Sequence, residues 1–348
     1  MQDTPESVID GPVDFEVSAL ETYLAARFGA AALSLQRISG GQSNPTYFVT
    51  WGERRMVLRK QPNGPILRGA HAVDREHRVL AALAGTDVPV PVPLLYEEDA
   101  TVLGTPFYLM ERLEGRVFHD SALPGMLPAE RRAIYMAMAD TMAKLHAVDP
   151  SAVGLEGFGR PGNYFERQIA RWAGQLEQST GEEIPHLAEV GDWLRDNMPA
   201  DDGSIAIAHG DYRLGNLIFH PDRADVIGIL DWELATLGHP LADLGYCCIP
   251  WHTASAEYGG ILDADPAASG IPTQSEFVDR YFSHSASGGR LEPFHVVFAL
   301  FRFAVIFVGV ADRARLGNAA AADAENLGPM AARLAVRARE IIGGQRNW

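Results

Sequence analysis

The middle of the chain contains a stretch that constrains the fold more than any other part of the sequence. Asp211 and Asn216 precede a short apolar run, and a second apolar run ends at Asp231. The polar segment 221–225, which contains a proline, separates the two runs, and this pattern predicts a β-hairpin with a loop of several residues. In a hairpin, the residue before the first strand and the residue after the second lie side by side. We therefore expect Asp211, Asn216 and Asp231 to converge at one end of the hairpin.

Two carboxylates and one carboxamide in this arrangement suit phosphoryl transfer. One carboxylate accepts the proton of a hydroxyl group, while the other, with an amide oxygen, binds magnesium against the phosphates. The competing interpretation is that Asp211 and Asn216 are ordinary turn residues and that Asp231 only ends a strand. The combination of all three at this spacing, with His209 and a glycine directly before Asp211, favours the chemical interpretation.

These residues carry a resemblance to a known family. The motif His209-Gly210-Asp211-x4-Asn216, followed by the run 229–233 (Ile-Leu-Asp-Trp-Glu), resembles the signature of the aminoglycoside-phosphotransferase-like (APH) family of small-molecule kinases. The run 238–246 resembles the segment that follows this motif in the family, and its sequence is most similar to the branch associated with acyl-CoA dehydrogenases. The resemblance implies an α+β, bilobal protein-kinase-like fold, with a small N-terminal β-sheet lobe and a larger, mainly helical C-terminal lobe.

The resemblance also implies roles for the residues of the motif. Asp211 is the catalytic base, and His209 supports its loop. Asn216 and Asp231 are the magnesium ligands. The expected cofactors are ATP and Mg²⁺.

The N-terminal part contains residues that match the nucleotide-binding side of such a kinase. A loop of small residues lies between two predicted strands, and backbone N–H groups in such a loop can hold phosphates. The loop departs from the Gly-x-Gly-x-x-Gly pattern of protein kinases, and Ser43 and Asn44 add side-chain donors to it. A plain hairpin turn is the alternative interpretation. By resemblance, backbone groups from Glu111 to Leu113, at the hinge between the lobes, receive adenine.

A strand predicted over 56–60 ends in two basic residues. Strand alternation puts Lys60 on the same face as Leu58 and puts Arg59 on the other face. By resemblance, Lys60 contacts the α- and β-phosphates, with Arg59 as the alternative. Glu76, on a predicted helix, then pairs with the lysine and orients it.

The predicted domain division lies after residue 112. Residues 1–112 are expected to form the nucleotide-binding lobe, with 1–13 disordered, and 113–348 the catalytic and acceptor-binding lobe. The segment 88–93 contains three prolines and is expected to be an extended connector. Apolar periodicity predicts helices over 15–28, 71–84, 128–145, 163–178, 186–197, 276–282, 294–316 and 319–342.

Composition excludes some classes of protein. The formal net charge of −16 argues against a nucleic-acid-binding protein. The apolar run 296–311 is interrupted by Arg302 and is shorter than the roughly 20 residues of a membrane span, so we expect a buried helix and no membrane partner. The two cysteines, Cys247 and Cys248, are adjacent, which fits a reducing cytoplasm. Residues 1–14 lack the features of a signal peptide. The sequence does not indicate an oligomeric state.

The leading interpretation is an ATP- and Mg²⁺-dependent phosphotransferase that moves the γ-phosphate to a hydroxyl of a small molecule. The branch suggests a hydroxyacyl-CoA or a hydroxy acid as acceptor, and an aminoglycoside or choline-type kinase is the alternative within this class. A protein kinase is disfavoured because no arginine lies between His209 and Asp211. Two other classes stay open, a metal-dependent hydrolase with His209, Asp211 and Asp231 as ligands and an inactive nucleotide-binding protein.

Overall fold

The structure is a computed structural model of the 348-residue chain, and it describes residues 8–38, 44–64, 71–160, 162–179, 181, 183–285, 289–315 and 327–345. The chain divides into two compact units. The first contains Met1–Gly115 and Ile227–Glu233, and the second contains Arg116–Val226 and Leu234–Trp348. The sequence places the division after residue 112 and does not assign 227–233 to the N-terminal part. The assignment of the units to nucleotide and acceptor binding stays a prediction.

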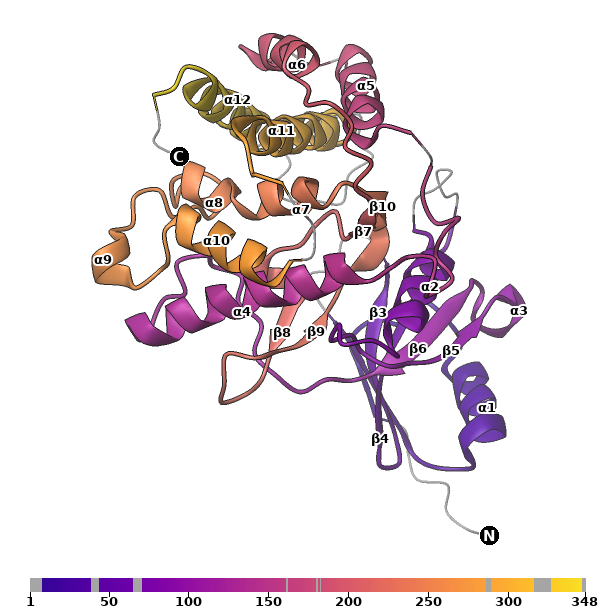
Figure 1. The fold of residues 1–348 in the computed structure, drawn as a ribbon. Helices are drawn as coiled ribbons and strands as arrows, with labels where there is room; N and C mark the ends of the chain where they lie inside the picture. The colour runs from indigo at the N-terminus through magenta and orange to yellow at the C-terminus, as the bar shows by residue number, and fades with distance from the viewer. Residues whose placement is uncertain are drawn as a thin grey trace. The chain divides into compact units, whose positions relative to one another are not determined.

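The first unit is built on a six-stranded sheet with the strand order β1-β2-β3-β4-β6-β5, of which β3 to β6 are labelled in Figure 1. β1 runs parallel to β2, and each of the other neighbouring pairs is antiparallel. The strands are β1 (Val8–Asp10), β2 (Leu33–Arg37), β3 (Thr46–Trp51), β4 (Arg54–Lys60), β5 (Pro93–Glu97) and β6 (Phe107–Glu111). The helices are α1 (Val17–Phe28), α2 (Val73–Leu83) and α3 (Ala100–Leu103). The helices predicted over 15–28 and 71–84 are confirmed as α1 and α2.

The core of this unit lies between α1 and one face of the sheet. Leu20 and Leu24 of α1 pack with Tyr47, Leu58 and Phe107 of the strands, and all five are buried. Burial alternates along β3, as expected for a strand with one face against a core. The predicted connector is confirmed for residues 88–92, which form no strand, whereas its last residue, Pro93, begins β5.

The prediction of disorder over 1–13 is wrong for residues from 8 onward. Val8–Asp10 forms β1, which pairs in register with Ser34, Leu35 and Gln36 of β2. The side chains of β1 are exposed, so backbone pairing along an otherwise open sheet edge holds the strand, rather than apolar burial. An apolar pattern in the sequence therefore does not reveal it. Residues 1–7 lie outside the described residues.

The second unit is mainly helical. Its helices are α4 (Pro128–Ala147), α5 (Tyr164–Glu177), α6 (Leu187–Asp196), α7 (Pro240–Cys247), α8 (Ile249–His252), α9 (Pro266–Ser269), α10 (Gln274–His284), α11 (Pro293–Arg315) and α12 (Leu327–Ile342). β7 (Ala206–Ala208) pairs with β10 (Thr236–Gly238). The predicted hairpin is present as the two-stranded sheet of β8 (Leu217–Phe219) and β9 (Val226–Ile229), although residues 227–229 of β9 are assigned to the first unit. The helices predicted over 128–145, 163–178, 186–197 and 276–282 are confirmed. Those predicted over 294–316 and 319–342 are confirmed for their described residues, as α11 and α12, whereas 316–326 lies outside the described residues.

α11 is the central helix of this unit. It packs against α5, α6, α7 and α12 (Figure 1). It is the helix in the described part of the chain that is long and apolar enough to cross a membrane, but 78% of its most apolar window is buried inside the protein. The prediction of a buried core helix is therefore confirmed, and Arg302 is buried with it.

Candidate active site

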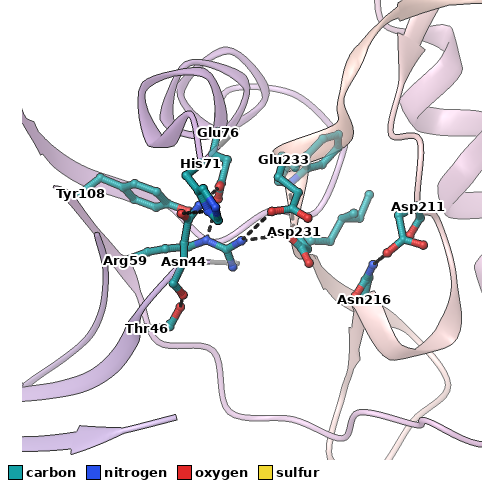
Figure 2. A network of polar contacts seen from close by, with 12 residues as sticks. Asn44, Thr46, Arg59, His71, Glu76, Tyr108, Asp211, Asn216, Asp231 and Glu233 are labelled. Atoms are coloured by element: carbon teal, nitrogen blue, oxygen red, sulfur yellow. Dashed lines mark hydrogen bonds and ion pairs between the residues drawn. The ribbon is translucent and has the colours of Figure 1, made fainter. Parts of the chain in front are cut away.

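Asp211 lies on the loop that follows β7, and several donors hold its carboxylate. Asn216 Nδ2 donates to Asp211 Oδ2 at 2.8 Å and to the Asp211 carbonyl oxygen at 2.9 Å (Figure 2). Tyr246 Oη donates to Asp211 Oδ1 at 2.5 Å, and Arg213 Nε lies 3.3 Å from Oδ2. The structure thus brings together Asp211 and Asn216, as their spacing predicts. Because the Asn216 nitrogen donates both bonds, the oxygen of the same amide is the atom suited to a cation.

The backbone before Asp211 is held just as closely. His209 is fully buried, and its Nδ1 accepts a hydrogen bond from the Asp211 N–H at 3.1 Å. Gly210 has a φ of 82°, and a Cβ at this position would lie 2.8 Å from the Leu234 carbonyl oxygen. The positive φ and this close approach together require glycine.

Asp243, at the start of α7, braces this loop from behind. Its carboxylate accepts hydrogen bonds from the His209 N–H at 2.6 Å and the Gly210 N–H at 2.9 Å. Burial acts to raise the pKa of Asp243. His146, whose Nε2 lies 3.3 Å from Asp243 Oδ2, opposes this effect through its hydrogen bond and charge, and together with the loop N–H groups it holds the pKa below its usual value. Asp243 therefore carries its charge inside the protein, where the loop backbone solvates it.

Arg302 contacts the Asp211 loop, and the sequence analysis did not include it among the site residues. Its Nη2 donates to the Gly210 carbonyl oxygen at 2.8 Å, so the two peptide groups of Gly210 are held by Asp243 on one side and by Arg302 on the other. In the sequence, Arg302 only interrupts an apolar run. A single arginine in a buried helix is nevertheless a signal, because a buried charge needs a partner.

A second cluster of charged residues surrounds Arg59 in the first unit. Arg59 Nε lies 2.8 Å from Glu76 Oε2, and its Nη2 lies 2.9 Å from Asp231 Oδ1 and 3.9 Å from Glu233 Oε2 (Figure 2). Asn44 Nδ2 also donates to Glu76 Oε1 at 2.7 Å. The structure therefore brings Glu76 and Asp231, two of the predicted site residues, to one guanidinium, and a third, Asn44, contacts Glu76.

The predicted pairing of Lys60 with Glu76 is wrong, because Arg59 makes this ion pair. Lys60 is fully buried, and its Nζ donates to Asp14 Oδ2 at 2.9 Å and to Asn63 Oδ1 at 3.2 Å. The physical reason is the strand alternation itself. Lys60 shares the core face of β4, whereas Arg59 projects from the opposite face and meets α2.

The electrostatics around Arg59 favour an additional cation. Burial raises the pKa of Glu76 to about 7 against the attraction of Arg59, and the nearby charges of Asp231 and Glu233 add to this increase. Burial also opposes the charge of Arg59, but the three carboxylates raise its pKa above the ordinary value. Asp231 has a φ of 65°, a left-handed conformation that aspartate tolerates better than most residues. Three carboxylates beside one guanidinium leave negative charge that a divalent cation would neutralise.

The available ligands suit magnesium better than a metal ion whose ligands all come from protein side chains. Within the described ranges, no group of three or more His, Cys, Asp or Glu side chains could hold a metal ion. Magnesium in kinases is typically bound by one or two protein groups, with phosphates and water completing its coordination. Asn216 and Asp231 belong to different units, so their joint coordination of one ion stays a prediction.

The structure leaves the other nucleotide-side predictions open. Ser43 lies outside the described residues. Glu111 ends β6, has an exposed side chain, and donates its N–H to the Val92 carbonyl oxygen at 2.8 Å. Leu113 is half-buried. Contacts of these backbone groups with adenine stay a prediction.

A cavity of about 340 Å³ adjoins Asp211 within the second unit. Arg213 and Tyr246, which both contact the Asp211 carboxylate, form part of its wall. The residues that line it include no aspartate or glutamate. Its other lining residues are mostly apolar or aromatic, and they include Tyr135, Met138, Tyr212, Ile249, Pro250 and Tyr258. The loop-rich segment 251–273 therefore contributes to this cavity through Tyr258.

A larger cavity, of about 590 Å³, lies elsewhere in the second unit. His239, Asp202 and Arg167 are among its lining residues, but the Asp211 loop is not. Its charges are mixed, and none of its lining residues is among those that hold the Asp211 carboxylate. The smaller cavity is therefore the better candidate for the acceptor.

The fold and the two polar clusters define a phosphotransferase of the kinase-like class. The sheet unit contributes the Arg59–Glu76 ion pair, and the helical unit contributes the loop with Asp211 and Asn216. A model of the APH "Phosphotransferase enzyme family" matches residues 34–273, and the chain belongs to this family. A crystal structure from Ralstonia eutropha JMP134, of a protein provisionally named an aminoglycoside phosphotransferase, is 41% identical, with a TM-score of 0.85 over 95% of this chain and 99% of that one. The fold class predicted from the sequence is confirmed.

Curated relatives support the predicted branch. Acyl-CoA dehydrogenase family member 10 of Mus musculus is 40% identical over 90% of this chain, and the probable acyl-CoA dehydrogenase IBR3 of Arabidopsis thaliana is 43% identical over 87%. The chain spans only 30% and 38% of the length of these two proteins. Aminoglycoside phosphotransferase APH(4)-Ia, solved in complex with AMP-PNP and hygromycin B, shares the fold at a TM-score of 0.63 and 17% identity.

Proposed function

We propose that this protein transfers the γ-phosphate of ATP, with Mg²⁺, to a hydroxyl group of a small molecule. The observation that carries the proposal is the Asp211 carboxylate, held by Asn216 and Tyr246 on a braced loop beside a cavity. Family membership supports the reaction class. Nucleotide use is supported by the relative APH(4)-Ia, which was solved with AMP-PNP.

In the proposed reaction, Asp211 accepts the proton of the acceptor hydroxyl while the oxygen of this hydroxyl bonds to the γ-phosphorus. The bond from this phosphorus to the oxygen bridging it to the β-phosphate breaks, and ADP leaves. The work of the protein is positioning and electrostatic stabilisation. The proposed magnesium ligands are the Asn216 amide oxygen and the Asp231 carboxylate. The ion, when bound, neutralises the charge of the phosphates.

We assign the phosphate-contacting cation to Arg59 rather than to Lys60. The Lys60 ammonium would have to leave the buried contacts with Asp14 and Asn63 to reach a nucleotide. Arg59 instead pairs with the helix glutamate, Glu76, which is the pairing that the family resemblance implies for this cation. A guanidinium also offers several donors in a planar fork that matches phosphate oxygens.

A pair of substitutions separates the two basic residues. Arg59→Ala is expected to raise the Kd of Mg-ATP by about 10- to 100-fold, because it removes charge-assisted hydrogen bonds to phosphate. Lys60→Met is expected to lower the melting temperature through the loss of the Asp14 contact, while the folded protein keeps its affinity. Calorimetric titration and thermal unfolding measure the two effects. The assignment is wrong if Lys60→Met weakens nucleotide binding and Arg59→Ala does not.

The cavity beside Asp211 favours an acceptor with an apolar body. Its lining residues include no aspartate or glutamate, so Asp211 is the one carboxylate described beside it, which is few for the several ammonium groups of an aminoglycoside. The guanidinium of Arg213 in its wall disfavours a cation such as choline. Arg213 and His119 instead suit an uncharged or anionic group near the hydroxyl. A hydroxy acid or a hydroxyacyl thioester such as a hydroxyacyl-CoA fits these features. The names of the curated relatives agree with this class.

Acceptor-dependent release of ADP tests the proposed function. We expect wild-type protein to bind Mg-ATP in a calorimeter and to release ADP when given hydroxy acids or hydroxyacyl-CoAs. Choline-type alcohols and aminoglycosides serve as comparison acceptors. A protein that does not bind Mg-ATP would contradict the reaction class, whereas turnover with aminoglycosides alone would contradict only the acceptor class.

The geometry disfavours the hydrolase alternative. His209 is fully buried, and its Nδ1 already accepts the Asp211 N–H, so this nitrogen serves the loop and not a metal. The inactive-protein alternative makes the opposite prediction in the ADP assay, because it allows nucleotide binding without acceptor-dependent turnover.

A further inference from the structure

Tyr246 contacts the Asp211 carboxylate, and neither the motif nor the family resemblance assigns it a role. Its hydroxyl donates to Oδ1 at 2.5 Å, while Asn216 Nδ2 donates to Oδ2 at 2.8 Å. Each oxygen of the carboxylate is therefore held by a donor from a different segment. Two such donors fix the rotation of the carboxylate about its Cβ–Cγ bond.

Tyr246 is itself held in place. The residue is 5% exposed, and the centroid of its ring lies 5.1 Å from that of the Phe303 ring on α11. The same helix, α7, also carries Asp243, which binds the backbone of the Asp211 loop. One helix thus positions both the backbone and the side chain of the proposed base.

The hydroxyl of Tyr246 acts as a hydrogen-bond donor over the working pH range. Burial, followed by the charge of Asp211, raises the pKa of Tyr246 well above the ordinary value of a tyrosine. The phenol therefore stays protonated and does not compete with Asp211 for a proton. Its role is geometric, and it also forms part of the wall of the cavity proposed for the acceptor.

We infer that Tyr246 is a positioning residue, which holds the Asp211 carboxylate in the orientation that receives the proton of the acceptor hydroxyl. This inference rests on the proposed function. Small errors in the placement of reacting groups reduce rates strongly, by about 10²-fold for a displacement of roughly 1 Å. Asn216 and Arg213 hold Oδ2, and the Tyr246 hydroxyl holds Oδ1. Loss of this hydroxyl is therefore expected to have a large effect on kcat and little effect on nucleotide binding.

Tyr246→Phe tests this role, because phenylalanine keeps the ring packing against Phe303 and removes only the donor. We expect kcat to fall about 10- to 100-fold, with the Kd of Mg-ATP unchanged. In an Asp211→Ala background the same substitution should change kcat by less than about twofold, since Tyr246 acts through Asp211. Tyr23→Phe is the matched control, because it removes a phenol hydroxyl bonded to another carboxylate, Glu97 Oε2, at 2.9 Å.

Several outcomes would overturn the inference. A Tyr246→Phe variant that keeps the wild-type kcat, or one that loses activity equally in both backgrounds, would show that the hydroxyl does not act through Asp211. Crystal structures of the wild type and the variant test the geometry without turnover. The Asp211 carboxylate should rotate in the variant, and an unchanged orientation would contradict the role. Absence of acceptor-dependent ADP release by the wild type would contradict the proposed function instead, and the crystallographic comparison would still decide the role of Tyr246 in positioning.

Discussion

Replacement of Asp211 with alanine is expected to lower kcat by about 10²- to 10⁴-fold, the usual contribution of a general base. In the proposed reaction, the variant lacks the group that accepts the proton of the acceptor hydroxyl. The affinity for Mg-ATP should stay within about twofold of the wild-type value, because the proposed partner of the Asp211 carboxylate is the acceptor and not the nucleotide. Steady-state ADP release and calorimetric titration measure the two quantities.

Two further variants sharpen this prediction. Asp211→Asn keeps the size of the side chain but cannot accept a proton as a carboxylate does, so its loss of kcat should approach that of the alanine variant. Asp222→Ala removes an exposed carboxylate from the hairpin loop and should leave kcat unchanged. Near-wild-type turnover by Asp211→Asn would show that Asp211 is not the base.

Replacement of Asp231 with alanine is expected to weaken the binding of Mg-ATP by about 10- to 100-fold, through the loss of a proposed magnesium ligand. Binding of ATP without magnesium should change much less, so the difference between titrations with and without Mg²⁺ isolates the contribution of the ion. The substitution also removes the ion pair with Arg59 at 2.9 Å. Thermal unfolding must therefore show that the variant is folded.

Asp74→Ala is the matched control for this experiment. Asp74 is an exposed carboxylate on α2 of the same unit, so its removal changes the net charge equally without touching the Arg59 cluster. The magnesium role of Asp231 would be excluded if the Asp231→Ala variant bound Mg-ATP as tightly as the wild type, or if Asp74→Ala weakened binding to the same extent.

The sequence alone determined the features that depend on neighbouring residues. Asp211 and Asn216 are five positions apart in one loop, so their spacing was enough to predict that they meet. The hairpin of β8 and β9 and the long helices such as α4 followed from apolar periodicity and turn residues. The order of polar residues in this stretch was also enough to identify the family, which the family model confirms.

The tertiary structure decided which faces meet, because contacts between distant segments depend on packing and not on local propensity. Alternation showed that Arg59 and Lys60 lie on opposite faces of β4, but only the packing of α2 determined that Arg59 reaches Glu76. Tyr246 and Arg302 converge on the Asp211 loop from separate helices, 35 and 92 residues away from their partners. A sequence separation of this size does not predict whether two residues make contact, so the role of these residues could be recognised only from the tertiary structure.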